Sequence, residues 1–196
     1  MKTAQPFYGV KSTPRRQIVR ELLEAYPIES ARTYTDTVVT LWELPHREEQ
    51  YAAVDVAILA KRFVTMERIP LYRRMVVEGA WWDFVDAIAA KLIGRLLREE
   101  RAAMTPVVTG WIDDPDMWLR RTAILSQLGH KASTDADLLF DFCRRRAHER
   151  EFFIRKAIGW ALRKYAKTDP DAVREFVDEM GDELSGLSRR EATKHL

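Results

Sequence analysis

Cysteine is almost absent from this 196-residue chain, in which Cys143 is the only one. A disulfide within the chain is therefore excluded. A single thiol is typical of proteins that are kept in a reducing compartment, so we expect the protein to be cytoplasmic.

Long apolar runs are lacking as well. No stretch of about 18 apolar residues occurs, so the sequence predicts no membrane-spanning helix. The first residues, MKTAQPFYGVKSTPRR, carry several cations but no apolar segment of the kind that a signal peptide needs. Neither secretion nor membrane insertion is expected.

Recognisable metal-binding motifs are also missing. The histidines are scattered, and they form neither an HExxH motif nor a cluster with paired cysteines. We expect no metal site and no other cofactor. The four positions are His46, His130, His148 and His195.

Net charge is low, +2 from 32 basic and 30 acidic residues, but the charges are unevenly distributed. Residues 144–164 carry eight cations against two acids, whereas acids gather in EEQYAAVD and WIDDPD. Separate basic zones are typical of a protein with one face toward nucleic acid, although solvated helix faces explain them equally well. A second zone, residues 1–20, has no acid and five cations: Lys2, Lys11, Arg15, Arg16 and Arg20.

Apolar residues recur at spacings of three and four along almost the whole chain, which is the pattern of amphipathic helices. No segment alternates polar and apolar residues over the length of a strand, so we predict an all-α fold. The expected N-caps are Thr13 before Pro14, Thr35 or Asp36, and Ser188, and Pro45 should end a helix. The predicted helices cover residues 14–26, 37–44, 46–63, 69–80, 81–100, 105–112, 115–129, 133–147, 150–167, 169–180 and 188–196.

Two short motifs recur along the chain. Val54-Asp55 is followed 31 residues later by Val85-Asp86, and residues 121–124 resemble residues 155–158, which lie 34 residues further on. Such periods are typical of α-solenoids of the HEAT or armadillo type. We expect one domain over residues 1–196, a superhelix of short antiparallel helix pairs with a concave groove. A compact irregular bundle is the alternative.

The stretch WWDFVD places Trp82 and Asp86 four residues apart, and therefore on one face of a helix. Ordinary helix architecture is one explanation, because acids in a first turn stabilise the N-terminus and one of the tryptophans would pack inside. From these six residues alone, that explanation is favoured.

Two later clusters combine tryptophan with cations. Trp118 and Arg121 lie three residues apart, which allows a guanidinium to contact an indole, although a surface stack that only adds stability fits equally well. In FFIRKAIGWALRKY, Gly159 would permit close approach of another backbone. One face of this helix is too polar for a core stripe and is expected to meet a polyanion or solvent. It carries Lys156, Trp160 and Arg163 or Lys164.

In their order along the chain, these motifs resemble the AlkD family of DNA alkylation-repair glycosylases. The resemblance rests on WWDFVD, WLRRTAIL, EFFIRKAIGWALRKYAKTDP and LSRREATKHL, with PFYGVKSTPRR and LWELPHREEQYAAVD in the early part. It covers essentially the whole chain and implies a HEAT-like superhelix. Family members also have a helix with an aromatic residue ahead of the position that matches Met1, and we expect this helix to be missing here.

The resemblance implies a metal-free hydrolase that cuts the N-glycosidic bond of N3- or N7-alkylated purines, such as 3-methyladenine and 7-methylguanine, in duplex DNA. By motif, Asp86 would be the catalytic carboxylate, Trp82 and Trp160 its aromatic partners, and Arg121 a cleft arginine that clamps phosphates. The expected partner is alkylated duplex DNA, bound by a monomer without a cofactor. Further DNA contacts are expected from Trp118, Arg120, Arg155, Lys156, Arg163, Lys164, Arg189, Arg190 and Lys194.

Two other functions are compatible with the sequence. One is a non-catalytic HEAT-like module that binds damaged or branched DNA, and the other is a protein-binding scaffold. A carboxylate such as Asp86 repels phosphates, which disfavours a pure DNA binder, and the basic zones disfavour a scaffold.

Overall fold

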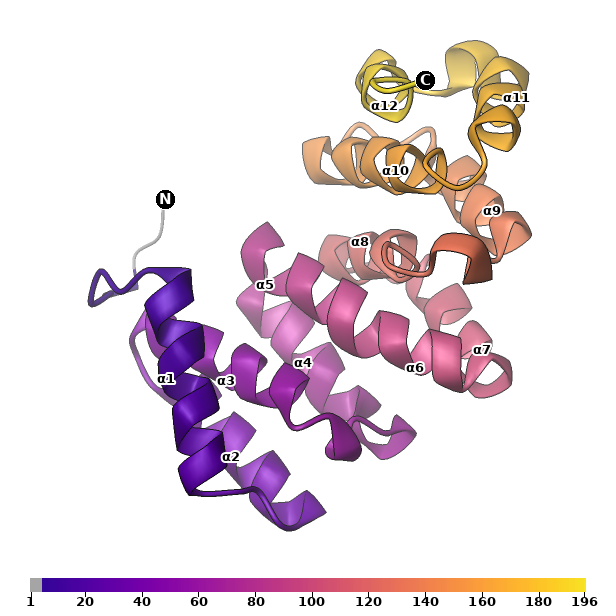
Figure 1. Ribbon diagram of the computed structural model, residues 1–196. Coiled ribbons are helices and arrows are strands. Elements are labelled where there is room, and N and C mark those ends of the chain that lie inside the picture. The colour runs from indigo at the N-terminus through magenta and orange to yellow at the C-terminus, as the bar shows by residue number, and fades with distance from the viewer. Residues whose placement is uncertain (1–4) are drawn as a thin grey trace. The chain divides into compact units, whose positions relative to one another are not determined.

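The computed structural model describes residues 5–196, and every regular element among them is helical (Figure 1). The all-α prediction is confirmed. Lys2, one of the cations of the N-terminal basic zone, lies outside the described residues. In the part that is described, no helix combines the length and apolar character needed to cross a bilayer.

Contacts divide the chain between Leu71 and Tyr72 into two compact units. The expectation of a single domain stays a prediction. In the first unit, α3 packs against both α1 and α2, and Asp55 of α3 accepts hydrogen bonds from Arg15 at 2.8 Å and Arg16 at 3.2 Å on α1. The elements are α1 (Ser12–Ala25), α2 (Ala31–Glu43), α3 (Arg47–Leu59) and the short 3-10 turns η1 (Lys61–Phe63) and η2 (Met66–Arg68).

The second unit contains the motifs singled out in the sequence. Its elements are α4 (Ile69–Gly79, which begins ahead of the boundary), α5 (Trp82–Ile88), the π-helical segment η3 (Ala89–Ile93), α6 (Gly94–Glu99), α7 (Arg101–Trp111), α8 (Met117–Leu125), η4 (Lys131–Ser133), α9 (Ala136–Arg146), α10 (Phe152–Tyr165), α11 (Pro170–Met180), η5 (Gly181–Glu183) and α12 (Gly186–Ala192).

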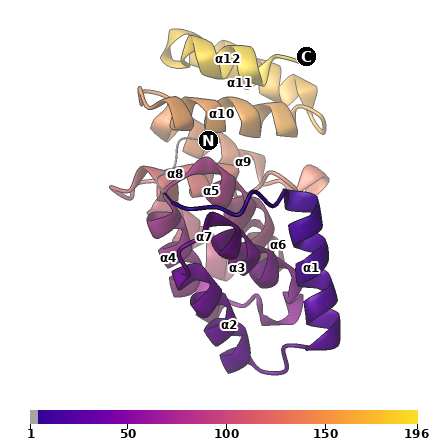
Figure 2. The same ribbon diagram turned by 90° about the vertical axis from the view of Figure 1, so that its left-hand side faces the viewer.

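Three helices of the second unit are stacked, with α10 between α8 and α12 (Figures 1 and 2). Gly159 makes the contact of α10 with α12 possible, because a Cβ there would lie 2.4 Å from the Glu191 Cβ and 2.8 Å from the Ser188 carbonyl oxygen. The close approach predicted at this glycine is confirmed. Layers of paired helices are typical of an α-solenoid, so the predicted fold class, an all-α solenoid, is confirmed.

Three helices begin earlier than predicted. The cap of α1 is Lys11 rather than Thr13, because Pro14 fits within the first turn, where its missing N–H is not needed. For α2 the cap is Ser30, whose hydroxyl accepts from the Thr33 amide, so the proposed Thr35 and Asp36 lie inside the helix.

The cap of α12 is also a different serine. Ser185 accepts the amide of Ser188 at 3.1 Å, and Ser188 is buried inside the helix, where its hydroxyl donates to the Arg155 carbonyl. Both serines are plausible caps in the sequence, and the tertiary contact with α10 decides between them.

Candidate active site

Asp86 and Arg121 form a two-point ion pair that joins α5 to α8. Nε of Arg121 donates to one carboxylate oxygen at 2.8 Å, and Nη2 donates to the other at 2.9 Å. The remaining nitrogen, Nη1, donates to the carbonyl of Phe153 on α10. Because two-point pairs fix the plane of both groups, the arginine holds the carboxylate in one orientation.

Exposed aromatic side chains border this carboxylate in a cavity of about 290 Å³. Trp82, one turn before Asp86, is 46% exposed, and Phe152, the first residue of α10, is 52% exposed. Trp160 completes the group from the middle of α10. Large apolar surfaces that gather around one cavity indicate a binding site. The spacing of Trp82 and Asp86 therefore does place them at one site.

The neighbouring tryptophan of the WWDFVD motif has the opposite environment. Trp81 is the N-cap residue of α5 and packs against Trp118, with ring centroids 6.2 Å apart, and against Phe153 at 5.4 Å. Helix architecture thus explains Trp81, and it also explains Asp83 in the first turn of α5. It does not explain the exposure of Trp82.

Glu191 of α12 lies at the edge of the same cavity between two cations of α10. It accepts from Lys156 at 2.9 Å and from Arg163 at 2.6 Å. The hydrogen bond from Lys156, with the charges of both cations, lowers the pKa of Glu191. The trio therefore carries one net positive charge beside Trp160 at neutral pH.

The electrostatic environment of Asp86 is dominated by burial. Loss of solvent raises the pKa of its carboxyl, Asp83 adds to the increase, and the hydrogen bonds and charge of Arg121 act in the opposite direction. The net direction is upward. A carboxylate in such a poorly solvated position interacts strongly with any positive charge that develops next to it.

The whole chain, residues 1–196, matches the family model described as DNA alkylation repair enzyme. The chain belongs to this family. A solved structure from Enterococcus faecalis, described as a predicted DNA alkylation repair enzyme, shares 31% identity and aligns with a TM-score of 0.87 over 97% of this chain and 88% of the other. Among curated proteins no significant match is found.

A second solved structure shares the fold of this chain. It is smu.31 from Streptococcus mutans UA159, which aligns with a TM-score of 0.71 and 15% identity over 93% of this chain and 99% of that chain. At this level of identity the similarity concerns the fold alone.

Three residues expected to contact DNA are engaged with protein groups: Trp118 and Arg121 are buried, and Arg120 is half-buried. Trp118 is only 8% exposed and packs against Phe153. Arg120 is occupied by the carbonyls of residues 114 and 115 and by Glu149. Arg121 is 4% exposed and bound to Asp86. In the structure the three nitrogens of Arg121 all have protein partners, and a phosphate clamp at this residue stays a prediction.

The remaining predicted DNA contacts are more accessible. Lys164, Arg190 and Lys194 are exposed, whereas Arg155 and Arg189 are half-buried. Lys164 and Lys194 line another small hollow, of about 280 Å³, together with Trp160, Arg163, Lys167 and His195. Lys156 and Arg163 share Glu191. Direct DNA contact by all of these residues stays a prediction.

Three residues that line the site were not singled out by the sequence patterns: Phe152, Phe153 and Glu191. Phe152 and Phe153 are adjacent, and consecutive residues on a helix point about 100° apart, so one of the two had to leave the core. This signal was available in FFIRK. Glu191 gave no comparable signal, because its partners are 28 and 35 residues away. Among residues 5–196, no three His, Cys, Asp or Glu side chains are grouped so as to hold a metal ion.

Proposed function

We propose that this protein is a DNA glycosylase of the AlkD type, which removes N3- and N7-alkylated purines from duplex DNA. The observation that carries the proposal is the Asp86 carboxylate, fixed by Arg121 next to the exposed indole of Trp82. Membership of the DNA alkylation repair enzyme family supports the same interpretation.

The chemistry of the substrate suits a lone carboxylate. Alkylation at N3 or N7 makes the base cationic, so the base leaves as a neutral molecule with the electron pair of the C1′–N bond. The deoxyribose then becomes oxocarbenium-like, as in other glycosidic cleavages. Asp86 would stabilise this positive charge and orient the water whose oxygen bonds to C1′ as its proton is released. No general acid is needed for the leaving group.

The aromatic side chains have a related task. Indole faces attract cations, so Trp82 and Trp160 would favour the positively charged sugar over the neutral one. Phe152 adds an apolar border that limits access of bulk water. The positive trio of Lys156, Arg163 and Glu191 would contact a phosphate at the rim of the cavity. We further propose that the protein acts as a cytoplasmic monomer.

The proposal is tested by base release from duplex DNA treated with a methylating agent. We expect the protein to release 7-methylguanine and 3-methyladenine as free bases, and to do so equally with and without EDTA, because departure of a cationic base requires no Lewis acid. Absence of release over the spontaneous background would contradict the proposed activity. Loss of release in EDTA alone would contradict the metal-independent mechanism.

The rate of base release should fall on the acid side of the pH profile. Because the pKa of Asp86 is raised by burial, its carboxyl should take up a proton at a pH above that of an ordinary aspartate, and the protonated form cannot stabilise a cation. Single-turnover rates, corrected for acid depurination without enzyme, measure the apparent pKa of this limb. An acid limb at or below the ordinary aspartate value would contradict the assignment.

The alternative is a non-catalytic module that binds damaged or branched DNA. It is favoured by one observation, that both oxygens of Asp86 accept hydrogen bonds from Arg121, as in an ion pair that only joins two helices. Under this alternative the protein binds methylated duplex DNA and releases no base, so the same assay separates the two functions.

A further inference from the structure

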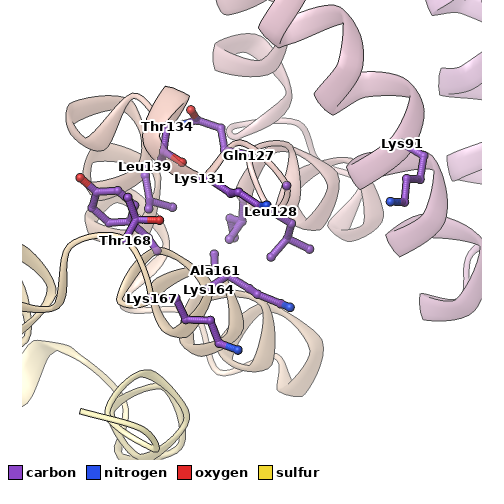
Figure 3. Close-up of a pocket in the computed structure, with 13 residues that line it drawn as sticks. Lys91, Gln127, Leu128, Lys131, Thr134, Leu139, Ala161, Lys164, Lys167 and Thr168 are labelled. Carbon is purple, nitrogen blue, oxygen red and sulfur yellow. The ribbon is translucent and has the colours of Figure 1, made fainter.

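Another cavity of the second unit, of about 460 Å³, is bordered by four lysines (Figure 3). Lys91 belongs to η3, Lys131 begins η4, and Lys164 and Lys167 come from the end of α10 and the turn after it. Among the described residues that line it there is no Asp or Glu, and its apolar lining includes Ile124, Leu128, Leu139 and Ala161. We refer to this cavity as the lysine hollow.

Some cations elsewhere in this unit share acids. Arg145 and Arg146 both contact Asp113, just as two cations of α10 share Glu191. By contrast, within residues 5–196 the four lysines of the hollow form no ion pair and no side-chain hydrogen bond. Like charges around one cavity repel each other, so an anion that enters the hollow lowers the energy of the whole group.

One side of the hollow is held in place by a buried anchor. Lys131 has a left-handed backbone, with φ 54°, which is uncommon for a residue other than glycine. The residue before it, His130, is buried, and its Nε2 lies 2.7 Å from the Gly94 carbonyl oxygen on α6. The loop that presents Lys131 is therefore tied to α6 by a buried hydrogen bond.

The hollow and the candidate active site are built on the same three elements. Along the continuous helix of α5 and η3, Lys91 follows Asp86 by five residues, and along α10, Lys164 and Lys167 follow Trp160 by four and seven. Leu128, just beyond the C-terminal end of α8, likewise lies further along the chain than Arg121 of that helix. At about 1.5 Å per residue, the hollow lies roughly 6–11 Å further along these helices.

We propose that the lysine hollow holds backbone phosphates of duplex DNA, two or three nucleotides from the one at the candidate active site. One DNA strand advances about 3.4 Å per nucleotide along the duplex axis. The distance of roughly 6–11 Å between the candidate active site and the hollow therefore corresponds to two or three nucleotides. The position relative to the damaged nucleotide rests on the proposed function. The binding of phosphates itself does not, because phosphates carry no information about the base.

The test is the salt dependence of binding to an undamaged duplex oligonucleotide. The triple variant Lys131→Gln, Lys164→Gln and Lys167→Gln should bind about 10–100-fold more weakly at 0.1 M salt, and the slope of log K against log salt should fall by about 0.9 for each phosphate that is no longer neutralised. The control has the same change in net charge at exposed positions outside the hollow: Lys61→Gln, Arg144→Gln and Arg174→Gln.

Unchanged affinity and slope in the hollow variant, or equal reductions in the control, would overturn the proposal. A duplex with a stable abasic analogue then tests the position. A neutral methylphosphonate two or three nucleotides from the analogue should weaken binding of the natural protein and not of the hollow variant, and a weakening that is the same for both would overturn the placement. If the protein releases no base, the proposed function fails, but the salt slope on undamaged DNA still decides whether the hollow binds phosphates.

Discussion

Asp86→Asn is expected to lower the rate of 7-methylguanine release by about a hundredfold or more while leaving duplex binding nearly unchanged. The side chain keeps its size and can still accept a hydrogen bond from Arg121, but it loses the negative charge that, under the proposed function, would face the sugar. Removal of one preorganised electrostatic group of this kind typically costs about 2.7–4 kcal/mol in the transition state. Single-turnover release at saturating protein, beside a binding titration, separates the two effects.

The repeat provides a matched control in Asp55→Asn. Asp55 occupies the same Val-Asp motif as Asp86 and also accepts hydrogen bonds from arginine side chains, those of Arg15 and Arg16, but it does not line the candidate cavity. Its replacement should lower thermal stability and leave the rate of release per folded molecule intact. If Asp86→Asn retains release, or if both variants lose it equally, Asp86 has no special catalytic role.

Local spacing placed Trp82 and Asp86 together but did not by itself identify them as a functional site. Trp82 and Asp86 share a helix face because they are four residues apart, and the structure brings both to one cavity. Trp160 joins them from α10, a contact that spacing could not foresee. Here the family resemblance supplied what the local pattern lacked, since residues from distant helices meet only in the folded chain.

Tertiary packing overrode the local pattern at Trp118. A tryptophan beside two arginines suggests a surface that meets DNA, but this indole packs against Phe153 and Trp81 and is buried. The exposed aromatics at this cavity are Trp82 and Phe152. Helical periodicity gives the relative directions of neighbouring side chains, but it does not say which direction faces the core when several faces carry aromatics.

The same limit applies to Arg121. Its spacing from Trp118 allowed a contact with the indole, and the family resemblance implied a phosphate clamp. In the structure its partner is a carboxylate 35 residues earlier in the sequence. A phosphate clamp and a carboxylate anchor require the same residue type and differ only in tertiary partners. They also differ in their consequences for stability and for salt dependence, which makes the two roles separable.

Arg121→Ala is therefore expected to lower the free energy of unfolding by about 3–5 kcal/mol, since removal of one partner leaves the buried Asp86 carboxylate unpaired. In a chain of this size this corresponds to roughly 6–20 °C in Tm. Base release per folded molecule should also fall, because the carboxylate loses its fixed orientation and its pKa rises further once the opposing effect of Arg121 is gone. Thermal melting and single-turnover release measure these changes, with Arg144→Ala as the control for an exposed arginine whose ion pair should contribute about 1 kcal/mol or less.

The double variant Asp86→Leu with Arg121→Met decides between the two roles of this arginine. Replacement of both charges by apolar groups should restore most of the stability that Arg121→Ala removes, while base release should be abolished because the Asp86 carboxylate is gone. If Arg121 acts only through these protein partners, the salt slope of duplex binding should equal that of the natural protein. A slope lower by about 0.9 in this stable variant would instead show that Arg121 neutralises a phosphate in the natural protein, and Arg121 would then be a clamp after all.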